Sequence, residues 1–281
     1  GYSFVSEDIL KKTQWDVEAC VPLENPISSE YEFLRPTILL KMIEGAGMQK
    51  YIAEPLRFFE LGKVFSRKGQ TAEEKPMLGA LLVLPGGKDE AFFEMKGAIS
   101  HLLERMGISS VSFDSAGQTP LSSPKNFWHP VRSAEIKVGQ EGTKIGFMGE
   151  ISPKVLVDFN IKERVIACEF DFDFLVKEAT EEKEYRPIPK YPALIRDIAV
   201  LVPTGELAEN VEALIHSIGK ELVADTDLFD IYEGQGIPEG VKNLAYHIVY
   251  QSEVRTLSEK EVDVLHKKIE EAMRENGWEV R

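Results

Sequence analysis

Three segments near the C-terminus decide the fold: Leu-Phe-Asp-Ile-Tyr-Glu-Gly at 228–234, Ile-Pro-Glu-Gly-Val-Lys-Asn-Leu-Ala-Tyr at 237–246, and Arg-Thr-Leu-Ser-Glu-Lys-Glu-Val at 255–262. The first two contain the alternating apolar residues that are typical of β-strands, on either side of a glycine-containing turn. In the third, Ser258 is the expected N-cap of a helix and Glu261 completes a capping box. Together they predict two strands followed by a helix.

The pattern continues on both sides of these segments. A first strand starts at about Arg196, and residues 206–220 are amphipathic with the period of a helix. The helix that Ser258 opens ends at Gly277, and a short last strand follows it. The apolar residues that define these elements are Ile198, Val200 and Val202; Leu207, Val211, Leu214, Ile215 and Ile218; Phe229 and Ile231; Leu244, Tyr246, Ile248 and Tyr250; Val262, Leu265, Ile269 and Met273; and Trp278 and Val280. This βαββαβ order predicts two helices on one face of a four-stranded antiparallel sheet, with the other face open.

The residues of the open face follow from the alternation of side chains along a strand. If Ile198, Phe229 and Leu244 point toward the helices, their neighbours point away. The predicted open face therefore contains Asp197, Ala199, Leu201, Asp230, Tyr232, Asn243, Ala245 and His247. Tyr232 can stack on an unpaired base, and Asp230 can accept hydrogen bonds from the Watson–Crick N–H groups of guanine. The alternative is that both are ordinary exposed strand residues, or that another domain covers them.

The charge of the chain limits how it could bind nucleic acid. The formal net charge is −14, and residues 186–281 carry 11 Lys and Arg against 18 Asp and Glu, a net charge of −7. Non-specific binding to nucleic acid requires a basic face that displaces counterions. Any RNA binding here must therefore be local and depend on stacking and base-edge contacts.

Composition excludes several other classes of protein. No apolar run approaches the roughly 20 residues of a membrane span, and no signal peptide is visible. Two cysteines, Cys20 and Cys168, fit a reduced cytoplasmic protein, although a disulfide between them stays open. Five scattered histidines and no Cys/His cluster indicate no metal site. The chain opens at Gly1 without a Met, so we expect a piece of a longer protein.

A domain boundary is expected where charged residues give way to prolines, over residues 177–192. The alternative is a long surface loop within one domain. We predict a domain over 1–185 and a second over 186–281. In the first, 89–105 and 35–48 have the apolar periodicity of helices beside several strand-like segments, which predicts an α+β domain with an antiparallel sheet.

Taken together, these motifs resemble the C-terminal part of the beta chain of bacterial-type phenylalanine–tRNA ligases. The resemblance covers essentially the whole chain and is most specific at its C-terminal end. Its residues are the three segments above with Trp-Glu-Val-Arg at 278–281, and Asn-Pro-Ile-Ser at 25–28, Phe-Leu-Arg-Pro-Thr at 33–37, Phe-Phe-Glu-Leu-Gly-Lys-Val-Phe at 58–65, Phe-Glu-Met-Lys-Gly at 93–97, His-Pro-Val-Arg-Ser-Ala at 129–134 and Gly-Phe-Met-Gly-Glu-Ile-Ser-Pro at 146–153. It implies a class II synthetase-like, non-catalytic module followed by a ferredoxin-like anticodon-binding domain. The N-terminal portion of such beta chains, which includes their editing region, lies outside this sequence.

The resemblance also implies site residues. Positions equivalent to Ala199, Asp230 and Tyr232 lie at the anticodon in the family, and Asn243 stands where relatives carry Ser. The helix at 35–48 and the segment around His129 belong to the subunit interface of the family. The interface residues implied here are Arg35, Ile38, Met42 and His129.

The resemblance implies partners as well: a catalytic alpha chain, in a heterotetramer of two alpha and two beta chains, and tRNA. ATP and Mg²⁺ are expected in the alpha chain, with no cofactor in this one. Class II ligases hold ATP with arginines in two motifs, because phosphates require fixed bidentate donors. Here Ser66 stands where the first Arg is expected, with Arg67 one position away, and residues 168–175 contain neither Gly nor Arg. We therefore expect no adenylation by this chain. The alternative function is a stand-alone ferredoxin-like module that binds a small ligand or another protein.

Overall fold

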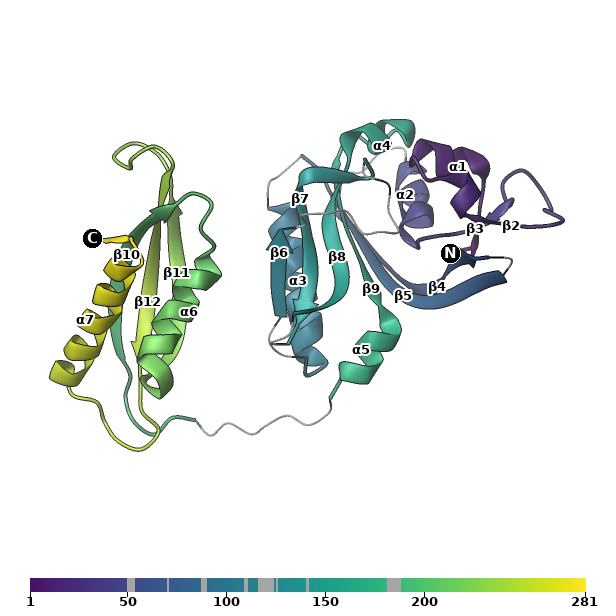
Figure 1. The fold of residues 1–281 in the computed structure, drawn as a ribbon. Helices are drawn as coiled ribbons and strands as arrows, with labels where there is room; N and C mark the ends of the chain where they lie inside the picture. The colour runs from purple at the N-terminus through teal and green to yellow at the C-terminus, as the bar shows by residue number, and fades with distance from the viewer. Residues whose placement is uncertain are drawn as a thin grey trace. The chain divides into compact units, whose positions relative to one another are not determined.

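The structure is a computed structural model that describes residues 1–49, 54–69, 71–86, 90–108, 111–115, 124, 126–139, 142–180 and 188–281. Its contacts divide the chain into two compact units, Gly1–Glu184 and Tyr185–Arg281 (Figure 1). Within the connector predicted over 177–192, residues 181–187 lie outside the described residues. They are called unit 1 and unit 2 below.

Unit 1 is built on a six-stranded antiparallel sheet, as its strand-like segments predicted. The strand order is β4-β5-β9-β8-β7-β6. The strands are β4 (Leu56–Lys68), β5 (Thr71–Leu84), β6 (Val111–Ser115), β7 (Trp128–Val138), β8 (Thr143–Ile151) and β9 (Arg164–Asp171). A small second sheet consists of β1 (Phe4–Val5), β3 (Phe33–Leu34) and β2 (Val21–Pro22), and a 3-10 turn, η1, covers Val17–Ala19.

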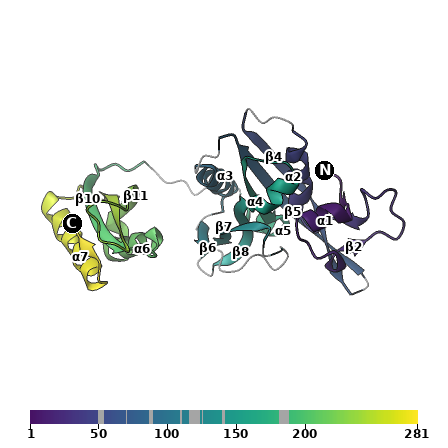
Figure 2. The ribbon, with the colours of Figure 1, turned by 90° about the horizontal axis from the view of Figure 1, so that it is seen from above.

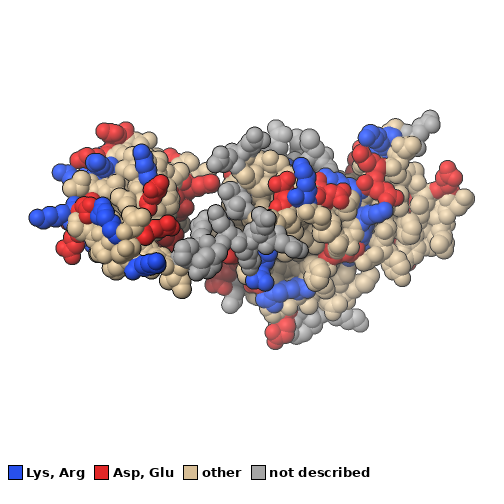
Figure 3. Space-filling view, turned by 90° about the horizontal axis from the view of Figure 1, so that it is seen from below, with Lys and Arg blue, Asp and Glu red and all other residues tan. Residues whose placement is uncertain are grey.

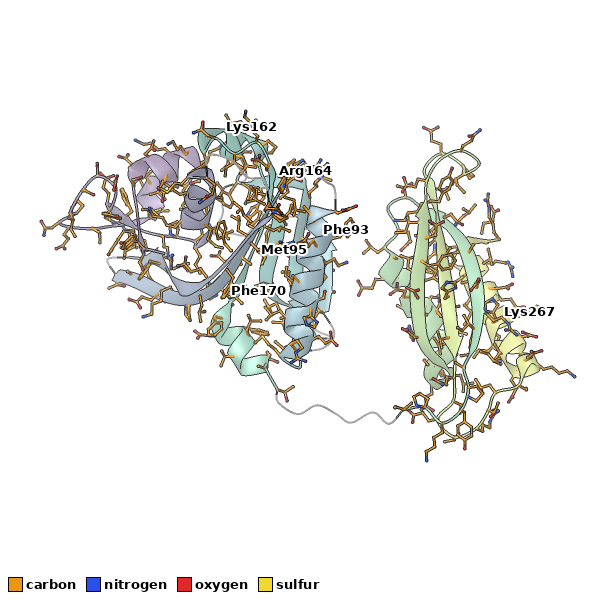
Figure 4. The ribbon with its side chains drawn as sticks, turned by 180° about the vertical axis from the view of Figure 1, so that it is seen from behind. Phe93, Met95, Lys162, Arg164, Phe170 and Lys267 are labelled. Atoms are coloured by element: carbon orange, nitrogen blue, oxygen red, sulfur yellow. The ribbon has the colours of Figure 1, made fainter. Side chains whose placement is uncertain are left out.

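Helices pack on both faces of the large sheet and form two hydrophobic cores. The first core contains apolar side chains of α1 (Glu7–Lys12), α2 (Leu39–Gly47) and α4 (Pro153–Asp158), and the second those of α3 (Ala91–Arg105) and α5 (Phe172–Glu178). In Figure 4, Met95 and Phe170 lie where α3 meets the sheet. Cys20 and Cys168 are free and buried in different cores, so the disulfide left open by the sequence is not formed.

Both helices predicted in this part of the chain are confirmed, with shorter bounds. The helix expected over 35–48 begins only at Leu39, and Pro36 disfavours helical backbone at Arg35, the first residue of the predicted range. Thr37 then contributes its hydroxyl, which accepts from the Leu39 N–H at 3.2 Å. The helix expected over 89–105 is α3, and its predicted first residues fall partly outside the described part of the chain.

Unit 2 has the predicted βαββαβ order. Its elements are β10 (Leu194–Pro203), α6 (Ala208–Gly219), the 3-10 turn η2 (Lys220–Leu222), β11 (Val223–Tyr232), β12 (Val241–Tyr250), α7 (Glu259–Glu275) and β13 (Glu279–Val280). The antiparallel strand order is β11-β12-β10-β13. Both helices lie on one face of this sheet (Figure 2), where their apolar residues share one core with Ile198, Leu244 and Tyr246.

The boundaries of α7 confirm the capping prediction. The Ser258 hydroxyl accepts from the Glu261 N–H and the Glu261 carboxylate accepts from the Ser258 N–H, which satisfies two N–H groups at the helix start. After the helix, Gly277 adopts φ +80°, a left-handed conformation that glycine adopts without steric cost. The chain can therefore turn into β13. Among the described residues, no helix is both long and apolar enough to cross a bilayer.

Candidate nucleic-acid interface

The sheet face of unit 2 opposite α6 and α7 brings the predicted anticodon residues together. Ala199 pairs with Ala245, which pairs with Asp230 on the next strand. One row further along, Asn243 pairs with Tyr232. Residues directly opposite each other in antiparallel strands point to the same face, so the four predicted anticodon residues and Ala245, from three strands, share this surface, the open face. Figure 4 turns it toward the viewer.

One side chain of the open face was predicted wrongly. Phe229 was expected to point toward the helices, but its side chain is 49% exposed and stacks on His247 of the open face. The cause is a β-bulge, because the register of β11 against β12 shifts between Leu228 and Asp230. A bulge places two residues opposite one, so Phe229 and Asp230 both face outward in succession.

The predicted exposure was also wrong at two positions. Leu201 and Ala245 belong to the open face by register, but both are buried. They lie on the two central strands of the sheet, β10 and β12, with a neighbouring strand on each side. The floor of the face is therefore apolar, with Ala199 half-buried beside them.

Tyr232 has a fixed position at the end of β11. Its hydroxyl donates to the Gln235 carbonyl at 3.1 Å, and its ring lies so close to Gly234 that a Cβ there would meet the ring carbons and hydroxyl. The side chain is 43% exposed. Because the hydrogen bond restrains the ring, a base that stacks on it would not have to order it first.

The side-chain amide of Asn243 is incompletely paired. Its Oδ1 is buried and has no hydrogen-bond partner among the residues that the structure describes. A buried polar atom without a partner costs free energy, and a bound group can supply that partner. Asn243 lies beside Tyr232 across the strand pair, so an N–H donor placed on Tyr232 would also lie near this amide.

A positive charge that the sequence analysis did not identify lies at the same end of the sheet. The Arg281 N–H donates to the Ala199 carbonyl at 2.9 Å, and its guanidinium donates to the Gly236 carbonyl at 3.4 Å. Elsewhere the charges are mixed: on the face shown in Figure 3, basic and acidic residues alternate on each unit without a continuous basic surface among the described residues. This distribution agrees with local rather than non-specific binding.

The four residues expected at a subunit interface lie in unit 1, and three are buried within it. Ile38 and Met42 belong to the first core of the chain itself. The guanidinium of Arg35 is enclosed by Glu60 at 2.6 Å and the Lys63 carbonyl at 3.0 Å. In this structure the three side chains thus offer no surface to a second chain, because α2 packs against the sheet. Their contact with a partner stays a prediction.

His129 is the fourth of these residues and is half-exposed. Its Nδ1 accepts from the N–H groups of Val131 and Arg132 at 3.3 and 3.2 Å. These contacts hold an irregular stretch of β7, where pairing with β8 shifts register between Trp128 and Ser133. The ring therefore stabilises a projecting segment of the strand, whose Val131 is exposed.

The two segments compared with the ATP-binding motifs of class II ligases lie on different elements of unit 1. Ser66 and Arg67 lie near the end of the β4–β5 hairpin, and the Arg67 guanidinium donates to the Glu18 and Gly69 carbonyls. The segment 168–175 forms the end of β9 and the start of α5. No group of three or more His, Cys, Asp or Glu in the described part of the chain could hold a metal ion.

Unit 1 also contains a cavity of about 730 Å³, lined by residues of α1, α2 and the segment 158–160. Two pairs of its charged groups contact each other, Lys41 with Glu44 and Lys12 with Asp8, both at 2.7 Å, and the carboxylates of Glu30 and Asp158 also line it.

Comparison with known families agrees with this geometry. The family described as "Ferredoxin-fold anticodon binding domain" matches residues 189–281, and the one described as "Phenylalanyl tRNA synthetase beta chain CLM domain" matches residues 1–172. Unit 2 thus has the ferredoxin fold of the first of these families. Since the second match covers more than half of the chain, this protein belongs to the phenylalanyl-tRNA synthetase beta-chain family.

Individual relatives align with the chain from end to end. It is 34% identical to the phenylalanine–tRNA ligase beta subunit of Clostridium tetani over 100% of this chain, and 32% identical to that of Thermotoga maritima over 98%. It covers 35% of each relative, so the chain spans about a third of their length. Because one relative contains both units in sequence, the comparison favours the beta-chain relationship over a stand-alone ferredoxin-like module.

Proposed function

We propose that this chain acts as the C-terminal part of a phenylalanine–tRNA ligase beta subunit and that the open face of unit 2 binds the anticodon of the tRNA. The observation that carries the proposal is the arrangement of Asp230 and Tyr232 beside the Ala199–Ala245 floor. A flat apolar floor with an aromatic ring and a carboxylate at its edge suits a single unstacked base.

The chemistry of this surface favours guanine as the first anticodon base. Phenylalanine codons are read by an anticodon that begins with guanine. The Asp230 carboxylate accepts only, and guanine presents N1–H and N2–H₂ donors on its Watson–Crick edge. Adenine has an acceptor at N1, which a carboxylate would repel. Tyr232 would stack on the base, and the unpaired amide of Asn243 would receive a further donor.

The role of unit 1 follows from the family relationship. We propose that it is a class II synthetase-like module that joins a catalytic alpha subunit, in an assembly of two alpha and two beta subunits in the cytoplasm. ATP and Mg²⁺ would bind to the alpha subunit, which would charge the tRNA with phenylalanine. The six-stranded antiparallel sheet supports this proposal, as does the absence of an arginine at Ser66 and over 168–175.

Aminoacylation kinetics test the anticodon site directly. The assembled enzyme would be assayed with tRNA that carries guanine or adenine at the first anticodon position, for the unaltered protein, Asp230→Asn and Tyr232→Ala. Tyr232→Ala should weaken tRNA binding by about 1–3 kcal/mol through the loss of one stacking contact. Asp230→Asn should reduce the preference for guanine more than the overall affinity.

The matched control is Asp263→Asn, at an exposed acidic residue of α7. It should change neither the affinity for tRNA nor the preference for guanine. Equal discrimination by Asp230→Asn and the unaltered protein would remove Asp230 from the site. In a separate assay, phenylalanine-dependent pyrophosphate exchange by this chain alone would contradict the assignment of chemistry to the alpha subunit.

A further inference from the structure

A pair of stacked aromatic rings lies on the open face, apart from Tyr232 and the other predicted anticodon residues. The rings of Phe229 and His247 stack nearly in parallel, with centroids 4.0 Å apart and an interplanar angle of 16°. Phe229 keeps about half of its surface exposed although it lies within a strand. We refer to these two rings, with Asp197, as the Phe229–His247 platform.

The platform is held in place from two sides. The Asp197 carboxylate accepts a hydrogen bond from His247 Nδ1 at 2.6 Å, which fixes the imidazole and leaves Nε2 for another partner. On the other side, the bulge between Leu228 and Asp230 turns Phe229 out of the register that would bury it. A fixed, exposed pair of rings can stack on a planar group without a large entropy cost.

The surroundings of the platform define the kind of group that it fits. Asp227 pairs with His247 across the strands and Asp225 pairs with Val249, so carboxylates flank the rings together with Asp197. They would repel a phosphate, and they would accept hydrogen bonds from an amino group. A planar ring that carries an exocyclic amino group, such as adenine, matches this combination of stacking surface and acceptors.

The distance between Phe229 and Tyr232 decides whether a single anticodon could contact both residues. Tyr232 follows Phe229 by three positions in β11, which is roughly 10 Å at about 3.3 Å per residue. Stacked nucleotides advance only about 3.4 Å each, but the bases of single-stranded RNA on a protein are splayed further apart, so two such steps can span this distance. A single anticodon could therefore place its first base on Tyr232 and a later base on the platform.

We propose that the Phe229–His247 platform is a second base-binding site, which stacks one of the two adenines that follow the first base of the phenylalanine anticodon. The inference rests on the proposed function, since it requires RNA on the open face. It adds recognition of a second base, because the Asp227 carboxylate beside the rings can accept a hydrogen bond from the adenine amino group. An adenine-to-uracil change at that base should therefore weaken binding.

Fluorescence of an adenine analogue tests this site. The 281-residue chain would be titrated into a 17-nucleotide RNA hairpin with the phenylalanine anticodon in its loop and 2-aminopurine at its second or third base. Because 2-aminopurine carries its amino group at C2 rather than C6, its fluorescence reports stacking, and binding strength would be measured with the unlabelled adenine hairpin. The unaltered chain should quench one of the two probes on binding. Phe229→Ala should remove that quenching and weaken binding roughly 5- to 150-fold. Phe229→Tyr keeps a ring and should restore both.

Further variants separate a specific effect from a general one. Ile231→Ala is the matched control, because Ile231 is an exposed apolar residue of the same strand whose register partner is Leu244 of the helix-facing row. It should bind within about twofold of the unaltered chain. His247→Ala removes the second ring and should reproduce Phe229→Ala. Circular dichroism would confirm that each variant folds.

The outcomes also separate this inference from the proposed function. If Tyr232→Ala weakens binding while Phe229→Ala and His247→Ala behave like Ile231→Ala, the platform is not a base site and the anticodon proposal stands. If none of these variants changes binding, or if the unaltered chain binds no hairpin, both proposals fail. If binding weakens in Phe229→Ala without any change in either probe signal, the ring only supports the sheet and the inference is overturned.

Discussion

Replacement of Ile38 by alanine tests whether α2 belongs to the core of unit 1 or to a subunit interface. Ile38 is fully buried next to α2 and faces Gly79 of β5. A Cβ built on Gly79 would lie 3.4 Å from Ile38 Cγ2, so this helix packs directly on the backbone of the sheet. Truncation of Ile38 would leave a cavity that Gly79 has no side chain to fill.

The expected loss follows from this packing. Ile-to-Ala replacements in cores cost about 2–5 kcal/mol, and the cost is larger where the surroundings cannot collapse. We therefore expect about 3–5 kcal/mol for Ile38→Ala. For a unit of this size 1 kcal/mol shifts the melting temperature by about 2–4 °C, so the midpoint of unit 1 should fall by about 6–20 °C.

Calorimetry of the chain without any partner is the appropriate assay. Replacement of a core residue lowers the stability of the isolated chain, whereas replacement of a residue that contacts only a partner chain does not. Val157→Ala is the control, since Val157 is an exposed residue of α4 in the same unit and should change stability by less than about 0.5 kcal/mol. An unchanged midpoint for Ile38→Ala, with lost binding to the alpha subunit, would refute the core assignment and restore the interface.

Four other substitutions test particular contacts. Gly62→Ala should destabilise unit 1 by about 1–3 kcal/mol in urea denaturation, because the added Cβ would overlap the buried Arg35 guanidinium, whereas Gly45→Ala, with open space, should not. Burial raises the pKa of Glu169, so the carboxyl group makes the fold less stable as pH rises above its ordinary pKa of 4.5; Glu169→Gln should therefore gain stability relative to the unaltered chain as pH rises from that value, and a pH-independent difference would contradict this. Ser258→Ala should cost unit 2 about 0.5–2 kcal/mol. Hydrogen bonds from Arg255 and Ser258 lower the pKa of Glu261 to about 2, so the contribution of Glu261 is present above about pH 4.5 and lost toward pH 2; equal acid sensitivity of Glu261→Gln and the unaltered chain would argue against it.

The elements of unit 2 could be predicted from sequence because each one carries a local signal. Strand alternation, helical spacing and the Ser258–Glu261 pair all act over a few residues, and the order of the elements then leaves one open face. Asp230 and Tyr232 were placed on the correct face by alternation alone. Phe229 was not, because a bulge depends on the pairing of two strands and has no signature in either one.

The contacts of unit 1 are harder to predict from the sequence than the elements of unit 2. The Glu169 carboxylate accepts from the Thr37 hydroxyl and the Ile38 N–H at 2.8 and 2.9 Å, across more than 130 residues. Arg35 likewise depends on Glu60 and on the absence of a side chain at Gly62. Apolar periodicity identifies a helix that packs against something, but it does not distinguish the chain's own sheet from a second protein.

The bulge in β11 means that this surface can change by insertion or deletion as well as by substitution. Leu228 pairs with Tyr246 and Asp230 pairs with Ala245, which are consecutive positions of β12. A chain that lacked Phe229 would therefore form a regular strand in which Asp230 and Tyr232 still point outward. The deletion of one codon could thus remove the phenyl ring while Asp230 and Tyr232 stay on the same face of the sheet. Transfer of this surface to another protein would require copying the length of β11 as well as its residues.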